Sequence, residues 1–284
     1  MAHIPSLLGT GLSCSFEFGP PRDAAGEATL AKTLDELSLR KPTYVSITYG
    51  AGGSTRDRTH DLVVEINNDR GLTAMAHLTC AAHRRSDLES LIERYASAGI
   101  ENILALGGDP PRDYDGPPGD LQYASDLVAL LREAGDFSVG VAAHPEPHPK
   151  SSSIAADRDH TAEKLAAADF AITQFFFEAR HYVDLVDGLA ARGVTKPVIA
   201  GIMPATSIAA ITRMSELQGS EFPAWLAEKL YAVEAQGPAA IRAVGVEEAT
   251  KLCQELMAAG VPGFQFFTLN FATATREICN NLGI

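Results

Sequence analysis

Strand-like and helix-like segments alternate eight times along this chain of 284 residues. Short apolar runs rich in Val, Ile and Phe predict the strands, and apolar residues at helical spacing predict the helices between them. No linker or change of composition divides the chain, so we expect one domain, residues 1–284. The predicted strands are 13–18, 44–49, 73–79, 102–106, 137–143, 170–177, 197–203 and 263–268.

Helices are expected after each of these strands. Ser54 or Thr55 and Ser86 are the expected N-caps of the second and third helices. The fourth helix contains Leu127, and the region 207–259 is long enough for two or three helices. The other predicted ranges are 25–39, 54–68, 86–98, 158–167, 180–191 and 271–281.

Eight strand–helix repeats predict an α/β fold in the form of a single (β/α)₈ TIM barrel. The rival architecture is a doubly wound open sheet, which normally carries a glycine-rich phosphate-binding turn after its first strand. Here that turn reads Gly19-Pro20-Pro21, which offers few N–H groups to a phosphate. The barrel is therefore the preferred prediction.

The chain carries 23 basic and 36 acidic residues, a net charge of -13. Nucleic acids and anionic membranes are bound through clustered Lys and Arg, so neither is an expected partner. The charge leaves room for a local basic pocket that binds a small anion.

Four cysteines are present, and none of them forms a C-x-x-C pair; they are Cys14, Cys80, Cys253 and Cys279. We expect reduced thiols in a cytoplasmic protein. The N-terminus lacks the features of a signal peptide. The uncharged stretch 256–275 is interrupted by Gly and Pro residues, which favours a buried helix end, turn and strand over a membrane span.

Barrel enzymes carry their sites at the carboxyl ends of the strands and in the loops that follow. Applied to the predicted strands, this rule selects one carboxylate, Glu17, inside the first strand and another, Asp109, after the fourth. The remaining candidates are Thr48, His77, Thr79, His144, His148 and Gln174.

Each candidate also has a structural explanation. Glu17 could pair with Arg22 or Lys41, and Thr48 is an ordinary strand residue. His77 is more often a hydrogen-bonded core histidine than a ligand-binding one. Asp109 could cap its own turn, and His148 could simply be exposed. Gln174 is as easily explained by a structural hydrogen bond as by a polar ligand.

No metal site is expected. His144 and His148 are four residues apart, but Pro145-Glu146-Pro147 prevents the helix that would align them. Two carboxylates, Glu17 and Asp109, remain at the barrel mouth. A buried acid with a raised pKa can donate a proton while an ionised partner stabilises positive charge.

Taken together, the motifs resemble those of the methylenetetrahydrofolate reductase family. They occur in the family's order over nearly the whole chain, which makes the resemblance specific. The motifs are SFEFGPP (15–21), YVSITYGAGGSTRDRT (44–59), HLTC (77–80), NILALGGDPP (102–111), YASDLV (123–128), HPEPHP (144–149), ITQFFF (172–177), PVIAGIMP (197–204) and GVPGFQFFTLN (260–270).

The resemblance implies a (β/α)₈ barrel equivalent to the catalytic domain alone. It also implies an enzyme that reduces 5,10-methylenetetrahydrofolate to 5-methyltetrahydrofolate with electrons from NADH or NADPH, usually through bound FAD. By the same resemblance, Glu17 is the general acid that opens the folate ring to a 5-iminium cation. Asp109 stabilises that cation beside the pterin and the flavin, and Gln174 binds the folate.

Further positions match those that line the family's FAD site. They are Thr48, His77, Leu106, Gly108, Asp109, Tyr123, Ala124, His144, His148, Asp157, His160 and Lys164. The family commonly has an arginine where this chain has Gly107, and a tyrosine where it has His144. A histidine, a tyrosine and an arginine are usual at Gln265, Phe267 and Phe271, the last two of which are associated with folate binding.

These departures concern ligand contacts, whereas Glu17, Asp109 and Gln174 are retained. Two mechanisms therefore stay open: FAD bound through altered contacts, or direct hydride transfer from NADH to the folate without FAD. A barrel that binds a reduced folate without reducing it, and a flavin enzyme for another substrate, are the more remote alternatives. The sequence does not determine the oligomeric state, nor the choice between NADH and NADPH.

Overall fold

The structure is a computed structural model that describes residues 2–9, 11–50, 56–109 and 115–284. Within these residues eight parallel strands close into a barrel in the order β1 to β8. The strands are β1 (Ser13–Phe18), β2 (Tyr44–Ile47), β3 (Ala74–Thr79), β4 (Asn102–Leu106), β5 (Ser138–Ala143), β6 (Phe170–Thr173), β7 (Val198–Ile202) and β8 (Gly263–Phe267). The predicted TIM barrel is confirmed.

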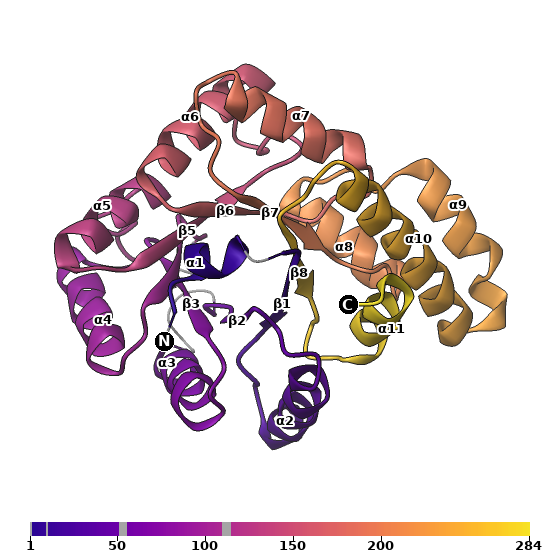
Figure 1. Ribbon diagram of the computed structural model, residues 1–284, viewed down its shortest axis with the longest axis horizontal. Helices are drawn as coiled ribbons and strands as arrows, with labels where there is room; N and C mark the ends of the chain where they lie inside the picture. Colours follow the sequence, from indigo (N-terminus) through magenta and orange to yellow (C-terminus); the bar gives the residue numbers. More distant parts are fainter. Residues whose placement is uncertain (1, 10, 51–55, 110–114) are drawn as a thin grey trace.

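Helices surround the barrel on the outside (Figure 1). A π-helical turn, Glu65–Asp69, follows α3, and a 3₁₀ turn, Glu234–Gln236, precedes α10. The helices are α1 (Ile4–Leu8), α2 (Ala24–Ser38), α3 (Arg56–Val64), α4 (Arg85–Ser97), α5 (Ala124–Ala134), α6 (Ile154–Ala167), α7 (Ala179–Ala190), α8 (Ile208–Gln218), α9 (Ala224–Ala232), α10 (Pro238–Ala258) and α11 (Thr273–Leu282).

The short helix α1 was not predicted. Figure 1 shows it lying across the barrel. Its apolar side chains are Ile4 and Leu8. They pack against side chains at the start of three strands, which are Tyr44, Met75 and Phe170. The amide of Ile4 also donates to Asn102 Oδ1 at 2.9 Å. This helix therefore closes the end of the barrel where the strands begin, leaving the carboxyl ends as the open mouth.

Strand β1 shows how the alternation of side chains positions the site. Phe16 and Phe18 point outward and are fully buried in the layer shared with Leu30 and Leu34 of α2. Glu17 points the other way, into the barrel, as period-two alternation requires. The prediction that Glu17 faces away from its two phenylalanine neighbours is therefore confirmed.

The end of β6 is a correction. The strand ends at Thr173 and not at residue 177. Phe175 leaves the barrel and packs with Met203, Ile208 and Leu226 in a separate cluster beneath α8 and α9. The apolar run continues because these side chains fill that cluster, and the sequence pattern alone does not distinguish this from further strand pairing.

Two helix starts also differ from the prediction. Ser86 is not an N-cap, because α4 begins at Arg85; carboxylates of Asp87 and Asp120 accept the amides of Arg84 and Arg85 at 3.2 and 2.8 Å. Helix α6 begins at Ile154, four residues earlier than expected, because Ser153 Oγ accepts the amide of Ala156. The caps expected at Ser54 or Thr55 lie outside the described residues.

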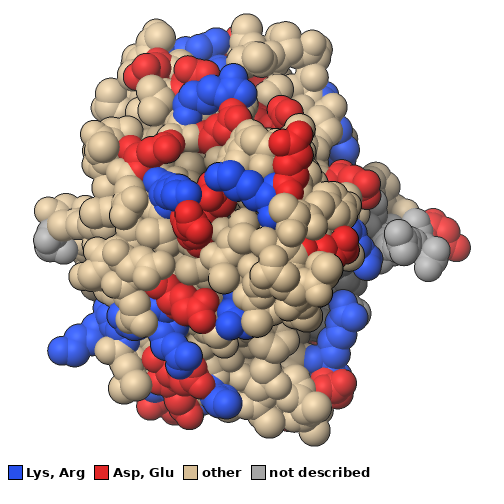
Figure 2. Space-filling view, turned by 90° about the vertical axis from the view of Figure 1, so that its right-hand side faces the viewer, with Lys and Arg blue, Asp and Glu red and all other residues tan. Residues whose placement is uncertain are grey.

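Acidic and basic side chains are interspersed over the face that carries α9, α10 and α11 (Figure 2). Ion pairs such as Lys229–Glu248 at 2.9 Å and Lys251–Glu247 at 2.6 Å explain the mixture. The net negative charge of the chain is therefore not gathered into one acidic patch on this face. In the part of the chain that the structure describes, no helix is long and apolar enough to cross a membrane.

Candidate active site

Glu17 lies inside the barrel mouth, with 18% of its side chain exposed. Strand register places it beside Ser46 of β2 and Phe267 of β8. The ion pairs of the described residues do not join it to Arg22 or Lys41, which were the structural explanations offered for it. Its surroundings are polar but uncharged.

Gln265 connects Glu17 to a buried hydrogen-bond network. Its Nε2 donates to Glu17 Oε2 at 3.3 Å and to Ser46 Oγ at 2.8 Å. Its Oε1 accepts from Ser15 Oγ at 3.0 Å. Because Gln265 is fully buried and uses both ends of its amide, its orientation is fixed.

Burial raises the pKa of Glu17 to about 7, and the hydrogen bond from Gln265 opposes this increase. Removing water disfavours the ionised carboxylate, and no cation is near enough to compensate. A substantial fraction of this carboxyl is therefore protonated at neutral pH. That is the state a general acid requires.

His77 stands on β3 with its Nε2 3.7 Å from Glu17 Oε2. The distance qualifies as an ion pair, but burial lowers the pKa of His77 to about 3, so the ring is neutral at physiological pH. We therefore interpret the contact as one between a neutral ring and a partly protonated carboxyl, and not as an ion pair. Within the described residues, Nε2 has no hydrogen-bond partner. A buried polar atom without a partner marks a position that a ligand or water can complete.

The second carboxylate, Asp109, stands apart from this network. Its side chain is 83% exposed, and its Oδ1 lies 3.2 Å from Lys150 Nζ. Exposure at both ends makes this a weak ion pair that is easily exchanged for another cation. Residues 110–114, which follow Asp109, lie outside the described part of the chain.

Gln174 and Thr48 lie just beyond the ends of β6 and β2, and both are half-buried. The amide of Gln174 donates to Ala143 O at 2.8 Å, and that of Thr48 donates to Phe18 O at 2.9 Å. Both backbones are thus tied to a neighbouring strand at the mouth.

The loop after β5 carries two histidines. The rings of His144 and His148 meet edge to face, with centroids 4.6 Å apart, although no helix joins them. Burial lowers the pKa of His144 to about 4, and the nearby His148 and Lys164 add to the effect. Among the described residues, no group of three His, Cys, Asp or Glu is arranged to hold a metal ion.

Helix α6 contributes three of the predicted site residues. Asp157 is 4% exposed, and its Oδ1 accepts the amide of His148 at 3.0 Å. Lys164 Nζ donates to Ala142 O at 2.6 Å, and burial lowers the pKa of Lys164 to about 8. His160 is exposed on the same helix. Asp157 and Lys164 therefore already have partners within the protein.

The remaining candidates lie at the end of β4 and at the start of α5. Tyr123 is 66% exposed and precedes Ala124, the first residue of α5. Leu106 is half-buried at the end of β4. Gly108 has φ 74°, and a Cβ there would approach Thr79 Cβ to 2.7 Å, so the position favours glycine.

Comparison with known proteins identifies the family. The sequence model of the family named methylenetetrahydrofolate reductase matches residues 8–283. The chain belongs to the methylenetetrahydrofolate reductase family.

Family relatives cover most of the chain. The 5,10-methylenetetrahydrofolate reductases of Pectobacterium carotovorum and Escherichia coli are each 38% identical over 274 residues, covering 96% of this chain and 91% of theirs. Methylenetetrahydrofolate reductase 1 of Schizosaccharomyces pombe is 32% identical over 95% of this chain, which spans 46% of that longer protein. This chain is therefore an oxidoreductase of the family.

A solved structure gives the same architecture. A Clostridium thermocellum protein described as binding two copies of 5-methyl-5,6,7,8-tetrahydrofolic acid superposes with a TM-score of 0.66 over 100% of both chains. Its sequence identity is only 13%, so this similarity supports the fold alone.

Three members of the Glu17 network went unnoticed as site residues in the sequence of this reductase. Ser15, Ser46 and Gln265 are small or neutral polar residues in otherwise apolar strands. A signal was available, because Ser13, Ser15 and Glu17 recur at the two-residue spacing of one strand face. Gln265 was noticed only as a departure from the family.

Proposed function

We propose that this chain reduces 5,10-methylenetetrahydrofolate to 5-methyltetrahydrofolate with a hydride from NADH or NADPH. The reaction would supply methyl groups for methionine synthesis in the cytoplasm. The observation that carries the proposal is the buried carboxyl of Glu17, whose pKa is raised to about 7. Among the described residues it has no Lys or Arg partner, and the nearby His77 is neutral. In a member of this family, such a carboxyl is suited to deliver one proton at the barrel mouth.

Glu17 would give its proton to the ring nitrogen N10 of the folate. The bond from N10 to the methylene carbon then breaks, and that carbon becomes the 5-iminium cation. A hydride from the nicotinamide adds to the cation and gives the N5-methyl group. The oxidised nicotinamide leaves, and Glu17 recovers its proton from water. Each turnover consumes one hydride and one proton.

Asp109 and Gln174 would bind the folate. Asp109 would exchange the exposed Lys150 for the developing cation, which its 83% exposure permits. The half-buried Gln174 would donate to, or accept from, the pterin edge. His77 Nε2, which has no partner among the described residues, would be completed by a bound ligand.

The expected flavin site fits FAD poorly. Gly107 provides no guanidinium, the carboxylate of Asp157 is used inside the protein, and Lys164 donates to a backbone carbonyl. A pyrophosphate normally requires free donors or cations. We therefore favour direct transfer from the reduced nicotinamide to the iminium carbon, and keep bound FAD as the alternative.

Activity and an absorption spectrum of the purified protein test these statements together. We expect 5-methyltetrahydrofolate to form when methylenetetrahydrofolate and NADH or NADPH are supplied to a colourless protein. An oxidised-flavin absorption band would show that the protein binds FAD, and we would then abandon direct transfer in favour of the FAD mechanism. If the protein bound the folate without turnover, the reaction would be ruled out and the alternative of a non-catalytic folate-binding barrel would hold. If it bound no folate at all, the whole proposal would be overturned.

A further inference from the structure

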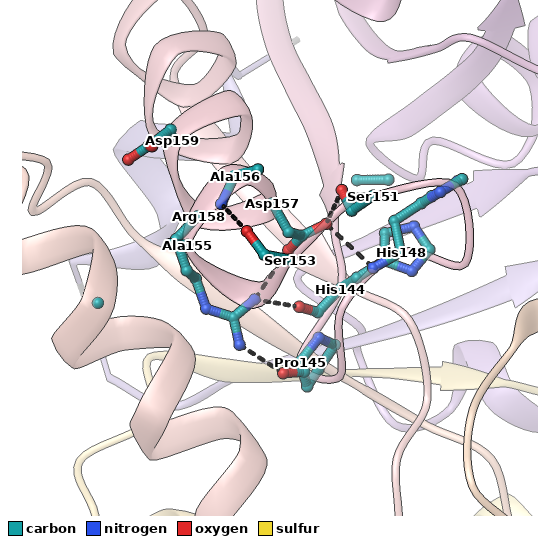
Figure 3. Close-up of polar contacts among 12 residues, drawn as sticks. His144, Pro145, His148, Ser151, Ser153, Ala155, Ala156, Asp157, Arg158 and Asp159 are labelled. Carbon is teal, nitrogen blue, oxygen red and sulfur yellow. Dashed lines mark hydrogen bonds and ion pairs between the residues drawn. The ribbon is translucent and has the colours of Figure 1, made fainter.

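Arg158 is buried at the base of the loop that carries the two site histidines. It lies on α6 and is 4% exposed, although its neighbour Asp159 is exposed. Its guanidinium donates to the carbonyls of His144 at 2.8 Å and Pro145 at 2.6 Å (Figure 3). One planar fork therefore holds two successive carbonyls, which a lysine's single ammonium does not reproduce.

Asp157 holds the other end of the same loop. Its Oδ2 lies 2.9 Å from the Arg158 guanidinium. Its Oδ1 accepts the amide of His148 at 3.0 Å and the hydroxyl of Ser151 at 3.3 Å. The buried pair thus fixes residues 144–151 from both sides (Figure 3).

A buried ion pair is a costly way to stabilise a fold, because both charges lose their water. Burial lowers the pKa of Arg158 accordingly, with Asp157 opposing the decrease. Apolar side chains in place of both members of such a pair would often serve stability equally well. The neighbouring helix α7 makes room for Arg158: a Cβ on Gly188 would approach Arg158 Cδ to 3.3 Å. What the pair adds is a defined loop conformation.

From this geometry we infer that Arg158 is a positioning residue, which holds the loop 144–151 and so sets the rings of His144 and His148 at the barrel mouth. The inference rests on the proposed function, and it takes the nicotinamide to bind at the mouth beside His144 and His148, two positions that by resemblance line the family's cofactor site. Arg158 itself lies behind the loop and touches no reacting atom. Its loss should therefore affect binding of the nicotinamide more than the proton transfer from Glu17.

Arg158→Ala, Arg158→Lys and a matched control test the inference. Arg158 and Arg192 both line a hollow of about 1150 Å³ on the outside of the barrel, between α6, α7 and α8. The guanidinium of Arg192 pairs with Asp159 at 2.6 Å and does not contact the loop, so Arg192→Ala is the control. For both Arg158 variants we expect the KM for NADH or NADPH to rise about tenfold or more, the effect of losing one charge-assisted contact, with kcat nearly unchanged. The hollow leads to Arg158, so millimolar guanidinium ion should partly restore the KM of Arg158→Ala.

A measurement that needs no turnover separates this inference from the proposed function. In the parent protein His144 is shielded from water, next to His148, Lys164, Asp157 and Arg158. If the loop loosens, the pKa of His144 should rise toward its ordinary value of 6.5 in both Arg158 variants. An NMR titration of the ring reports this even if the chain reduces no folate.

The inference is overturned if the folded Arg158→Lys protein keeps the parent KM and the parent His144 titration. It is equally overturned if Arg192→Ala reproduces the changes of the Arg158 variants. Should Arg158→Ala fail to fold, the lysine variant, which keeps the charge beside Asp157, decides the question alone.

Discussion

Gln265 donates to the carboxylate of Glu17 across the seam where the last strand of the barrel meets the first, with Nε2 3.3 Å from Oε2. The bond favours the ionised acid and so opposes the effect of burial on its pKa. The neutral amide thus lowers the pKa of Glu17 only partly. A lysine or arginine at position 265 would pair with the carboxylate and keep it ionised.

Glu17→Gln should abolish most of the reductase activity. The variant keeps the shape of the side chain and removes its proton, and general acid catalysis typically contributes a factor of about 10² to 10⁴. The rate of 5-methyltetrahydrofolate formation measures the loss. Glu248→Gln is the control, because Glu248 is similarly shielded, with 11% of its side chain exposed, but sits in a salt bridge on α10. A parent rate for Glu17→Gln would remove the role assigned to it.

Gln265→Met should shift the pH dependence of activity upward. Without the amide donor the ionised carboxylate is less stable, so the pKa of Glu17 should rise above its present value of about 7. The acid then stays protonated at higher pH, so the alkaline decline of kcat/KM should begin at a higher pH than in the parent protein. A pH profile that does not move, or moves toward acid, would show that Gln265 does not tune this group.

The stability of the protein should respond to the ionisation of Glu17. Its pKa is raised from 4.5 to about 7 on folding, so its stabilising contribution is complete below pH 4.5 and is lost as the pH rises through 7. The free energy of unfolding of Glu17→Gln minus that of the parent should therefore increase over this range, by up to about 3 kcal/mol. The depressed pKa of His77 acts in the opposite direction, but it cancels in the difference. Urea unfolding at several pH values measures it, and a constant difference would contradict the raised pKa.

Gly107→Arg should strengthen FAD binding. The backbone leaves space there, since the nearest atom to an added Cβ is Ala124 N at 4.0 Å. By resemblance, an arginine at this position contacts the flavin cofactor, and a charge-assisted hydrogen bond is worth about ten- to a hundredfold in affinity. Titration with FAD would show the gain, and Gly107→Gln controls for size without charge. Equal affinity in all three proteins would mean that the site excludes FAD for other reasons.

Ile4→Ala should destabilise the barrel by about 2–5 kcal/mol, because Ile4 is fully buried beneath the strands. Denaturant unfolding measures the loss. Ile154→Ala provides the control, because Ile154 is 60% exposed. Equal stability of the two variants would show that α1 is not an integral closure of the barrel.

The barrel was predictable because the same strand–helix pattern occurs eight times along the chain. Eight strands with helices between them allow single boundaries to be wrong, as that of β6 was, without changing the architecture. Glu17 was also predictable, since an acid between Phe16 and Phe18 must face away from both. Such local patterns require no knowledge of distant parts of the chain.

The contacts of the site were less predictable. Gln265 meets Glu17 only because the barrel closes, and Arg158 reaches its carbonyls only because the loop folds back over α6. Nothing in the local sequence distinguishes Arg158, which is buried, from its exposed neighbour Asp159. Long-range geometry, and not residue type, gives these side chains their partners.

The β1–β8 pairing has a consequence for the order in which a ribosome makes this chain. Glu17 emerges among the first residues, whereas its partner Gln265 follows 248 residues later. Until β8 is added, the mouth remains open along one side, and the acid should titrate like any solvated glutamate. The raised pKa of Glu17, the proposed proton donor, thus depends on the last strand of the barrel to be synthesised, so we expect chains that lack β8 to be inactive.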